Sequence, residues 1–549
     1  MPRLVLILFC LAYLVPGFVG RSAWKGADVA SLGWMSTLSE GSATWLHPSL
    51  AGVQPEYPAL LPYWLGALTL RHCPEWISPD FAVRLPFALL LLLTMVTTWF
   101  ASYYLARNPR AQPVAFAFGG EPPPAAYASA MADGALLALI ACLGLAQLAH
   151  ETTPALAQVG FSGLLLFSFA ALPWQPYRAQ TGAWLALLGL SLSGAPAMAL
   201  LYAGGGIASL WLDPADRAGQ TVGTVRRQTI GVLAGALVVA GIAWSLDLWR
   251  WKIVPVRAQW ADWEGYLELV IWFTWPAWPL ALWTTWRWRK QWLQPKPSRH
   301  LLLPLWFVGV TLCTTLLSSG SDRTLLLALP ALASLAAFAL PTLKRQVASL
   351  IDWFTLFFFS GCSLIIWVVW IAMMTGYPSQ PSANVARLAP GFTAEFAPLA
   401  FAVALLATLV WAWLVKWRVG RHRAAIWKSL VLPAGGAALC WLLLMTLWMP
   451  LLDFAQSYNR LVTNTLAQLS PAGCVEVYNV GPGKLGAFHF YGGVSLQAMG
   501  AQPQCPWLMA EPEGDGAPPA GVATAHWTLL AAVHHPTDGN ENILLFKRR

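Results

Sequence analysis

The sequence predicts a polytopic α-helical membrane protein that crosses the membrane about thirteen times and carries a small α/β domain at its C-terminus. Three observations support this fold class. Of the 549 residues, 57% are hydrophobic and only 10% are charged, whereas about 25% are charged in an ordinary soluble domain. Apolar runs of about membrane length recur along the chain. The 33 tryptophans are typical of side chains that lie at a membrane–water interface.

The first apolar run, residues 4–20, directly follows Arg3, as the hydrophobic part of a secretory signal would. No small-residue cleavage box of the A-x-A kind follows Val19, Gly20 and Arg21. We therefore interpret this run as a retained first span, with the N-terminus in the cytoplasm.

The remaining spans follow from apolar length, and the charges between them set their orientation. Spans are expected at residues 4–20, 82–105, 127–148, 155–174, 182–194, 195–212, 228–247, 265–285, 301–318, 324–342, 353–374, 396–415 and 426–447. The connections on the N-terminal side then hold Arg107, Arg110, Arg178, Arg217, Arg226, Arg227, Arg287, Arg289, Lys290, Lys296, Arg299, Lys344, Arg345, Lys416, Arg418, Arg421 and Arg423. Because basic loops stay in the cytoplasm, the opposite face is predicted to be the periplasmic face of a bacterial inner membrane. The net charge of +9 is therefore not interpreted as a nucleic-acid signal.

Residues 182–212 allow two interpretations. The run is long for one helix and contains Ser193-Gly194-Ala195-Pro196 near its middle. Two half-length spans around this break keep every later loop on its predicted side. A single long tilted helix would reverse all the later assignments.

Three segments are predicted to lie outside the cytoplasm and to be long enough for chemistry: loop 21–81, loop 248–264 and tail 448–549. We expect a membrane domain, residues 1–447, that includes the first of these loops, and a periplasmic α/β domain formed by the tail. Within loop 21–81, stretches 27–39 and 58–71 are amphipathic and are expected to lie on the membrane surface.

The tail contains the signals of a small folded domain. The run from Cys474 to Val480 is strand-like, Gly481-Pro482-Gly483 is a turn signal, and Ile543 to Phe546 is a last strand candidate. A disulfide between Cys474 and Cys505 fits an oxidising compartment.

Several short motifs follow one another in a characteristic order. Asp28 stands shortly after the first span, and Glu56 precedes a proline-rich stretch that ends in Tyr63-Trp64-Leu65. Further along come Arg84-Leu85-Pro86, residues 188–196, Trp275-Pro276 and Ser321-Asp322-Arg323. Through residues 1–345 this order resembles the GT-C glycosyltransferases of the aminoarabinose-transferase and protein O-mannosyltransferase kind. The resemblance implies thirteen spans with a C-terminal domain on the far side, and transfer from a polyprenyl-phosphate-linked sugar donor.

A sugar on a lipid phosphate already has a good leaving group, so the site must orient or deprotonate the acceptor and hold the departing phosphate. Asp28 is predicted to be the base or orienting carboxylate. The alternative is that it caps a helix N-terminus, and the two roles can coexist. For a second catalytic carboxylate, Glu151 lies at the outer mouth of its span. Asp133 fits the family's local pattern better but is expected near the cytoplasmic end.

The resemblance also implies that Glu56 helps to hold a divalent metal ion, and the alternative is a solvated loop glutamate. Basic side chains on the outer face break the positive-inside trend, so an anionic lipid phosphate is a fitting partner for them. The predicted substrate-binding residues are Lys25, Arg84, Arg250, Lys252, Arg257 and Arg323.

The predicted function is transfer of a sugar, with inversion, from a polyprenyl-phosphate donor to an envelope acceptor that is a lipid, a glycan or a protein. The competing class is a lipid or glycan transporter or flippase, which would have midplane charges or discontinuous helices. The break at Gly194 favours a transporter, and the scarcity of midplane charge favours an interfacial enzyme. A noncatalytic scaffold for envelope assembly is a third alternative.

Overall fold

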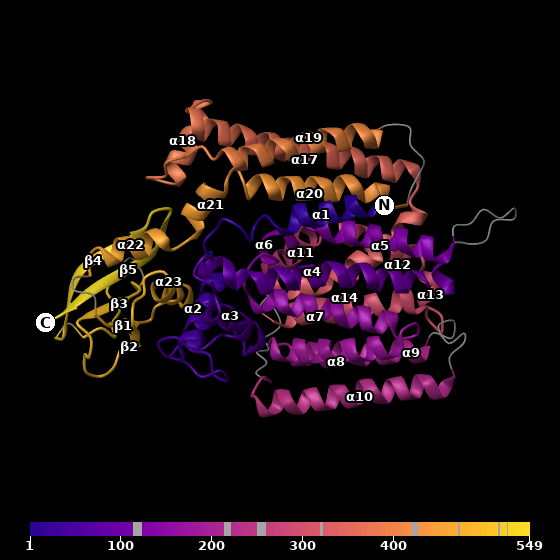
Figure 1. The fold of residues 1–549 in the computed structure, drawn as a ribbon, viewed down its shortest axis with the longest axis horizontal. Coiled ribbons are helices and arrows are strands. Elements are labelled where there is room, and N and C mark those ends of the chain that lie inside the picture. Colours follow the sequence, from indigo (N-terminus) through magenta and orange to yellow (C-terminus); the bar gives the residue numbers. More distant parts are fainter. Residues whose placement is uncertain are drawn as a thin grey trace.

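A bundle of apolar helices forms most of the molecule, and a small sheet domain stands at one end of it (Figure 1). The computed structural model describes residues 1–112, 123–212, 221–249, 260–318, 322–419, 426–469, 473–513, 517–523 and 525–549. Within these ranges, nine helices are long and apolar enough to cross a membrane. The predicted count of thirteen spans stays a prediction, because several further helices are shorter.

The longer helices of the bundle run roughly side by side in Figure 1. The described helices of this part of the chain are α1 (Arg3–Leu14), α4 (Pro79–Ala106), α5 (Pro124–Ala141), α6 (Leu145–Leu148), α7 (Pro154–Ala171), α8 (Pro176–Leu192), α9 (Pro196–Leu212), α10 (Val222–Ser245), α11 (Trp260–Phe273), α12 (Ala277–Arg287), α13 (Arg289–Trp292), α14 (Arg299–Leu317), α15 (Asp322–Leu325), α16 (Leu329–Ala339), α17 (Arg345–Thr375), α18 (Ser379–Leu388), α19 (Pro398–Val419) and α20 (Val431–Leu444). Short 3₁₀ turns occur at Pro109–Ala111, Leu326–Ala328, Leu340–Thr342 and Ile426–Leu430.

Burial separates central from peripheral helices. Every residue of α16 is buried, and α16 packs against α5, α12 and α14. In contrast, most residues in the apolar stretches of α10, α17 and α19 are not buried inside the protein. A helix that is apolar all round needs either protein or lipid on every side, so these peripheral helices are suited to face lipid.

The segment 182–212 forms two helices, as one of the two interpretations predicted. However, α8 begins at Pro176, so α8 and α9 have 17 residues each and are not half-length. Gly194, with φ +87°, lies in the turn between them, and a Cβ there would come within 2.6 Å of the Pro58 carbonyl oxygen. The Leu60 amide also donates to the Leu192 carbonyl. The turn therefore lies at the same end of the bundle as the first outer loop.

Both predicted stretches of the first loop are helical, as α2 (Ala27–Glu40) and α3 (Leu61–Arg71). The expectation that they lie on the membrane surface is wrong for α2. Its residues 28–38 are all buried, and α2 packs between α3 and α23 (Pro482–Phe490) of the tail. A Cβ on Gly33 would meet the Gly486 Cα at 2.6 Å. This close crossing of two glycines explains why α2 is covered by protein on the face that was expected to meet lipid.

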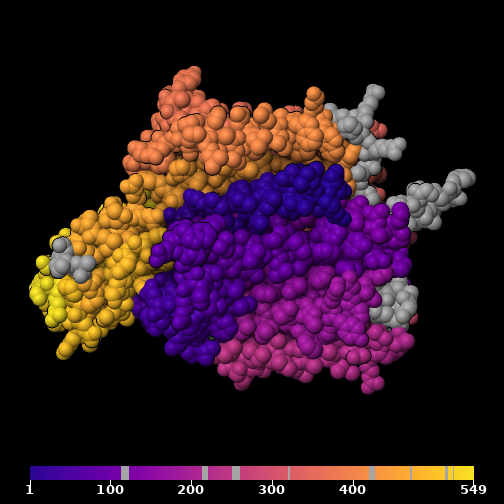
Figure 2. Space-filling model, viewed as in Figure 1, coloured from indigo at the N-terminus to yellow at the C-terminus, as the bar shows by residue number. Residues whose placement is uncertain are grey.

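The tail is a mixed α/β domain, as predicted, and Figure 2 shows it (yellow) resting against the indigo residues of the first loop. It contains α21 (Met449–Gln456), α22 (Asn459–Leu466), α23 and the strands β1 (Val475–Tyr478), β2 (Leu496–Ala498), β3 (Trp507–Ala510), β4 (Trp527–His535) and β5 (Asp538–Arg548). The strand order is β2-β1-β3-β5-β4. β1 pairs in parallel with β2 and β3, and the other pairs are antiparallel.

The sulfur atoms of Cys474 and Cys505 are joined in a disulfide, with the two Cα atoms 5.3 Å apart. The bridge links the residue before β1 to the connection that precedes β3. Closing a loop with a sequence separation of 31 is expected to stabilise the domain by roughly 3–4 kcal/mol. Thiol labelling of the denatured, non-reduced protein should leave both cysteines unlabelled, and labelling after reduction is the control. Full labelling without a reductant would contradict the bridge.

Candidate active site

A cavity of about 830 Å³ lies where the bundle, the first outer loop and the tail domain meet. The bundle contributes Thr153, Gln158, Met198, Thr314 and Arg323 to its walls. The first loop contributes Ala30, Trp34, Glu56 and Tyr63, and the tail domain contributes Tyr458, Lys484, Glu511 and Glu541. A pocket with apolar walls and a few converging polar groups is the usual form of a ligand site.

Asp28 lies behind the cavity wall, and its side chain is only 1% exposed. The backbone amide and hydroxyl of Thr152 both donate to Asp28 Oδ1 at 2.7 Å. Arg21 Nη1 donates to Asp28 Oδ2 at 2.9 Å, and the Trp24 amide donates to the same oxygen at 3.2 Å. The helix N-cap is Gly26, so the alternative prediction that Asp28 is the capping residue is wrong.

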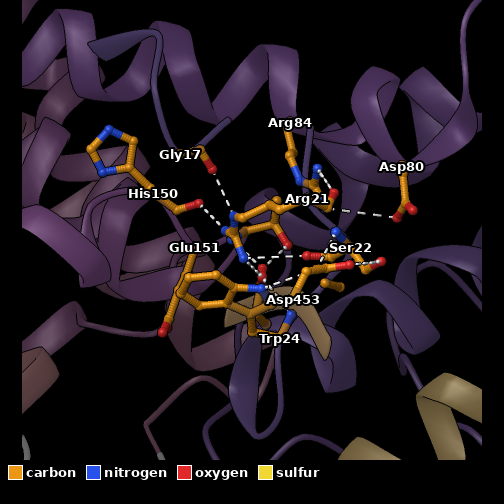
Figure 3. A network of polar contacts seen from close by, with 12 residues as sticks. Gly17, Arg21, Ser22, Trp24, Asp80, Arg84, His150, Glu151 and Asp453 are labelled. Atoms are coloured by element: carbon orange, nitrogen blue, oxygen red, sulfur yellow. Dashed lines mark hydrogen bonds and ion pairs between the residues drawn. The ribbon is translucent and has the colours of Figure 1, made fainter. Parts of the chain in front are cut away.

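Arg21, which pairs with Asp28, also contacts the surrounding elements, and Figure 3 shows it between Gly17, His150 and Arg84. Its Nε donates to the Gly17 carbonyl and its Nη2 donates to the His150 carbonyl, both at 2.6 Å. Arg84, predicted to bind substrate, is buried here and donates to the Arg21 carbonyl. The first span, the start of α4 and the connection before α7 are thereby held together.

Asp453 of α21 ties the tail to the same network (Figure 3). Its carboxylate accepts hydrogen bonds from the Ser22 amide at 2.8 Å and from Trp24 Nε1 at 3.2 Å. The Tyr491 hydroxyl, just after α23, donates to Asp80 at 2.8 Å. These contacts fix the tail domain against the first outer loop and so define the gap that becomes the cavity.

The charges and hydrogen bonds around Asp28 indicate a carboxylate that holds neighbouring residues in place. Burial alone would raise the pKa of Asp28, but the charges of Arg21 and Arg84 and the hydrogen bonds from Thr152 hold it below its ordinary value. A base must reach the proton that it removes, and Asp28 is not among the residues that line the cavity. Its catalytic role stays a prediction, and the geometry favours a positioning role.

Glu151 supports a cation that faces the cavity. The carboxylate is 5% exposed and accepts a hydrogen bond from Arg323 Nη2 at 2.8 Å. Burial raises the pKa of Glu151, and the Arg323 charge only partly opposes that rise. The Arg323 side chain is 35% exposed and lines the cavity, and its Nε has no hydrogen-bond partner among the described residues.

Asp133, the rival second carboxylate, lies elsewhere. Its Oδ2 accepts from the N-terminal amine of Met1 at 2.7 Å, and its Oδ1 accepts from Trp99 Nε1 at 2.9 Å. Figure 1 shows the N-terminus at the end of the bundle away from the tail domain. Of the two alternatives, Glu151 lies beside the cavity, paired with the cavity-lining Arg323, whereas Asp133 does not.

The other predicted site residues have different surroundings. Lys25 forms an ion pair with Asp538 of β5, with an Nζ–Oδ2 distance of 3.6 Å. Glu56 is exposed and lines the cavity. Among the described residues, no group of three His, Cys, Asp or Glu side chains fits a metal ion, and the metal-binding role of Glu56 stays a prediction. The remaining three candidates, Arg250, Lys252 and Arg257, lie outside the described residues.

Several residues of the site were not singled out in the sequence. Arg21 and Asp453 carry no local motif, because each gains its role from partners far along the chain. Lys484 lies on α23, Glu511 directly after β3, and Glu541 on β5. The sequence pattern that pointed to this part of the site was the turn Gly481-Pro482-Gly483, which begins α23 just before Lys484.

Together, the bundle, the buried first-loop helix and the far-end α/β domain form the fold of a polytopic helical membrane protein, and this fold is similar to that of solved GT-C glycosyltransferases. One of these solved structures is that of ArnT, an aminoarabinose transferase from Cupriavidus metallidurans. Its crystal structure bound to undecaprenyl phosphate has a TM-score of 0.59 and 15% identity, and the match covers 100% of this chain and 98% of that chain. The apo structure of ArnT has a TM-score of 0.60 and 15% identity, and the match covers 99% of this chain and 98% of that chain.

An oligosaccharyltransferase from Archaeoglobus fulgidus, tethered with an acceptor peptide, also matches, at 9% identity and a TM-score of 0.44. That match covers 90% of this chain and 63% of that chain. No protein-family model matches the sequence. No curated protein sequence matches it either. The similarity to the two ArnT structures shows the fold alone.

His150 next to this network is expected to make stability depend on pH. Burial, reinforced by the Arg21 charge, lowers the pKa of His150 from 6.5 to about 4. Between these values the unfolded chain binds a proton that the folded chain does not, so stability falls as the pH drops through this window, by about 3 kcal/mol in total. Thermal unfolding at pH 7.5 and 4.5 measures this loss.

The matched variants for this test are His150→Phe and His47→Phe. His150 packs against Phe18 and Trp441 with ring centroids 4.8 and 4.7 Å apart, so phenylalanine keeps an aromatic ring without a titrating group. We expect His150→Phe to lose part of the pH dependence and the exposed His47→Phe to keep it. An unchanged pH dependence in His150→Phe would contradict the assignment.

Proposed function

We propose that this chain is a membrane glycosyltransferase that moves a sugar from a polyprenyl-phosphate donor to an envelope acceptor, with inversion at the anomeric carbon. The observation that carries the proposal is the cavity between bundle and tail domain, with Arg323 on its wall. A fold neighbour crystallised with undecaprenyl phosphate supports a lipid-linked donor.

The departing phosphate is proposed to bind between Arg323 and the start of α7. Arg323 offers a guanidinium that Glu151 holds in place. Thr153, directly before α7, is buried and lines the cavity, and its hydroxyl has no hydrogen-bond partner in the described part of the chain. A helix N-terminus favours an anion. A cation and a hydroxyl aimed at the leaving oxygen stabilise the charge that develops as the sugar–phosphate bond breaks.

The acceptor oxygen attacks the anomeric carbon from the side opposite the phosphate. The new carbon–oxygen bond forms as the bond to phosphate breaks, and the acceptor's proton passes to a carboxylate. We assign Glu56 to this role, because it belongs to the first loop and lies on the cavity wall. Asp28 and Glu151 act indirectly in this scheme, by positioning Thr152 and Arg323.

A transporter is less well supported than an enzyme. The break at Gly194, which favoured a transporter, is a turn between two separate helices at the cavity end of the bundle. Discontinuous helices of transporters instead have their breaks near the membrane midplane.

A deletion strain tests the function. Mass spectrometry of its lipid A, envelope glycans and glycoproteins should show one glycoform lost, and that glycoform identifies the acceptor. The wild-type gene should restore it. A glycoform profile identical to that of the parent strain would contradict the proposal.

We further propose a bacterial inner-membrane location with a cytoplasmic N-terminus and a periplasmic tail. The basic connections support this orientation, and the first outer loop and the tail lie at the same end of the bundle (Figure 1). A reporter fused after residue 450 should behave as periplasmic, and one fused after Arg110 should behave as cytoplasmic. The reverse result would overturn the orientation.

A further inference from the structure

Asp453, on tail helix α21, holds a short segment of the first outer loop (Figure 3). This segment, residues 21–25, precedes α2, and we call it the strap. Asp453 Oδ1 accepts hydrogen bonds from the Ser22 amide at 2.8 Å and from Trp24 Nε1 at 3.2 Å, and its Oδ2 accepts from the Ser22 hydroxyl at 3.0 Å. The backbone of Trp24 also pairs with that of Ser457 in an antiparallel bridge. The tail therefore holds the strap through both side-chain and backbone contacts.

The strap in turn holds Asp28. The Trp24 amide and Arg21 Nη1 donate to Asp28 Oδ2 at 3.2 and 2.9 Å. The Arg21 guanidinium also lies over the Trp24 ring, 4.7 Å from its centroid. Trp24 thus contacts two carboxylates at once, Asp453 through its indole and Asp28 through its amide. A shift of the strap would move the donors that hold Asp28.

The other oxygen of Asp28 holds the segment that carries the phosphate-binding groups. Asp28 Oδ1 accepts from the amide and from the hydroxyl of Thr152, both at 2.7 Å. On one side of Thr152 lies Glu151, which pairs with Arg323 at 2.8 Å, and on the other lies Thr153, which lines the cavity. Because the peptide bonds between neighbours are planar, the position of Thr152 restricts both. The carboxylate and the three residues 151–153 are buried, and a buried, hydrogen-bonded network has few alternative arrangements.

We propose that Asp453 is a positioning residue for the departing phosphate. It acts through Trp24 and Asp28 on residues 151–153, and these residues place the groups that receive the phosphate. The inference rests on the proposed function, because it concerns the phosphate site of that function. The phosphate site, built from the membrane bundle, is then complete only when the tail domain is docked.

The test measures how much the phosphate group adds to lipid binding. Native mass spectrometry of the full-length protein in detergent compares undecaprenyl phosphate with undecaprenol, which has the same chain and no phosphate. Asp453→Asn should weaken binding of undecaprenyl phosphate by about tenfold and leave binding of undecaprenol unchanged. Trp24→Phe removes one donor to Asp453 and keeps an aromatic ring beside Arg21, so it should weaken phosphate binding by about threefold. A protein that is only loosened or misfolded would lose both lipids alike.

A double-mutant cycle tests the route of the effect. Thr153→Val removes a hydroxyl from the phosphate site and keeps the shape of the side chain. If Asp453 acts through the segment that contains Thr153, the two substitutions together should weaken binding of undecaprenyl phosphate by less than the product of their single effects. Effects that simply multiply would mean that the two residues act independently, and would overturn the proposal.

The matched control is Asp538→Asn. Asp538 also joins the tail to the strap, through an ion pair of 3.6 Å with Lys25. Within the described part of the chain, Asp538 forms no hydrogen bond or ion pair with Trp24 or Asp28. This variant should bind both lipids like the wild type. A loss of phosphate binding equal to that of Asp453→Asn would contradict a specific role of Asp453.

Arg323→Gln separates failure of this inference from failure of the proposed function. If Arg323→Gln weakens binding of undecaprenyl phosphate while Asp453→Asn and Trp24→Phe bind it like the wild type, the phosphate site stands and the role of Asp453 is wrong. If Arg323→Gln binds undecaprenyl phosphate as tightly as the wild type, the proposed phosphate site is wrong, and the inference falls with it.

Discussion

Replacing Asp28 with asparagine is expected to lower the free energy of unfolding by about 3 kcal/mol, the typical effect of breaking a buried ion pair. The substitution leaves the Arg21 guanidinium, whose side chain is 2% exposed, without its anion. It also replaces one acceptor oxygen of Asp28 by a donor that faces other donors. Thermal and denaturant unfolding of the purified protein measure the change.

The matched control is Asp538→Asn, which removes the same charge from a more exposed pair with Lys25. Surface pairs contribute at most about 1 kcal/mol, so this variant should unfold almost like the wild type. The positioning role of Asp28 predicts mainly a loss of stability in Asp28→Asn, whereas a role as the base predicts mainly a loss of turnover. If Asp28→Asn keeps wild-type stability and loses turnover, Asp28 is the base and the positioning role is wrong.

Replacing Arg323 with glutamine is expected to reduce turnover of the lipid-linked donor by about a hundredfold or more, as for loss of a group that stabilises developing charge. Glu151 would lose its ion pair, but its raised pKa means that protonation limits the damage to the fold. Arg323→Lys keeps a point charge without the planar fork and should retain part of the activity. The assay measures release of polyprenyl phosphate from donor lipids extracted from the host.

Arg387→Gln provides the control for this effect. Arg387 is exposed on α18 and does not line the cavity. Its replacement by glutamine removes the same positive charge as Arg323→Gln. We expect it to turn over donor at the wild-type rate. Equal activity of Arg323→Gln and Arg387→Gln would remove Arg323 from the leaving-group site.

Much of the fold was predictable, because helices and strands are local patterns. Apolar length located the long helices, and strand-like alternation located β1 and part of β5. The pairing of Cys474 with Cys505 followed from their shared compartment. The burial of α2 was not predictable, since the helix that covers it, α23, is encoded near the other end of the chain.

The same limit applies to the site. Sequence order identified Asp28, Glu151 and Arg323 as noteworthy, and the structure places all three near the cavity. The sequence order did not distinguish a carboxylate that takes part in the reaction from one that holds other residues in place. That distinction depends on Thr152, which lies 124 positions from Asp28, and on the enclosing charges of Arg21 and Arg84. No periodicity or motif in the sequence records such contacts.

The hydrogen bond between Ser22 and Asp453 joins residues that are 431 positions apart in the sequence. This sequence separation has a consequence for biosynthesis. At about 5–20 residues per second, the ribosome needs about 20–90 s to add the missing partner. During that time the newly made first loop has neither Asp453 nor α23 to cover its apolar helix. A chain that stops early keeps this surface uncovered, so quality-control proteases can distinguish truncated chains from finished ones.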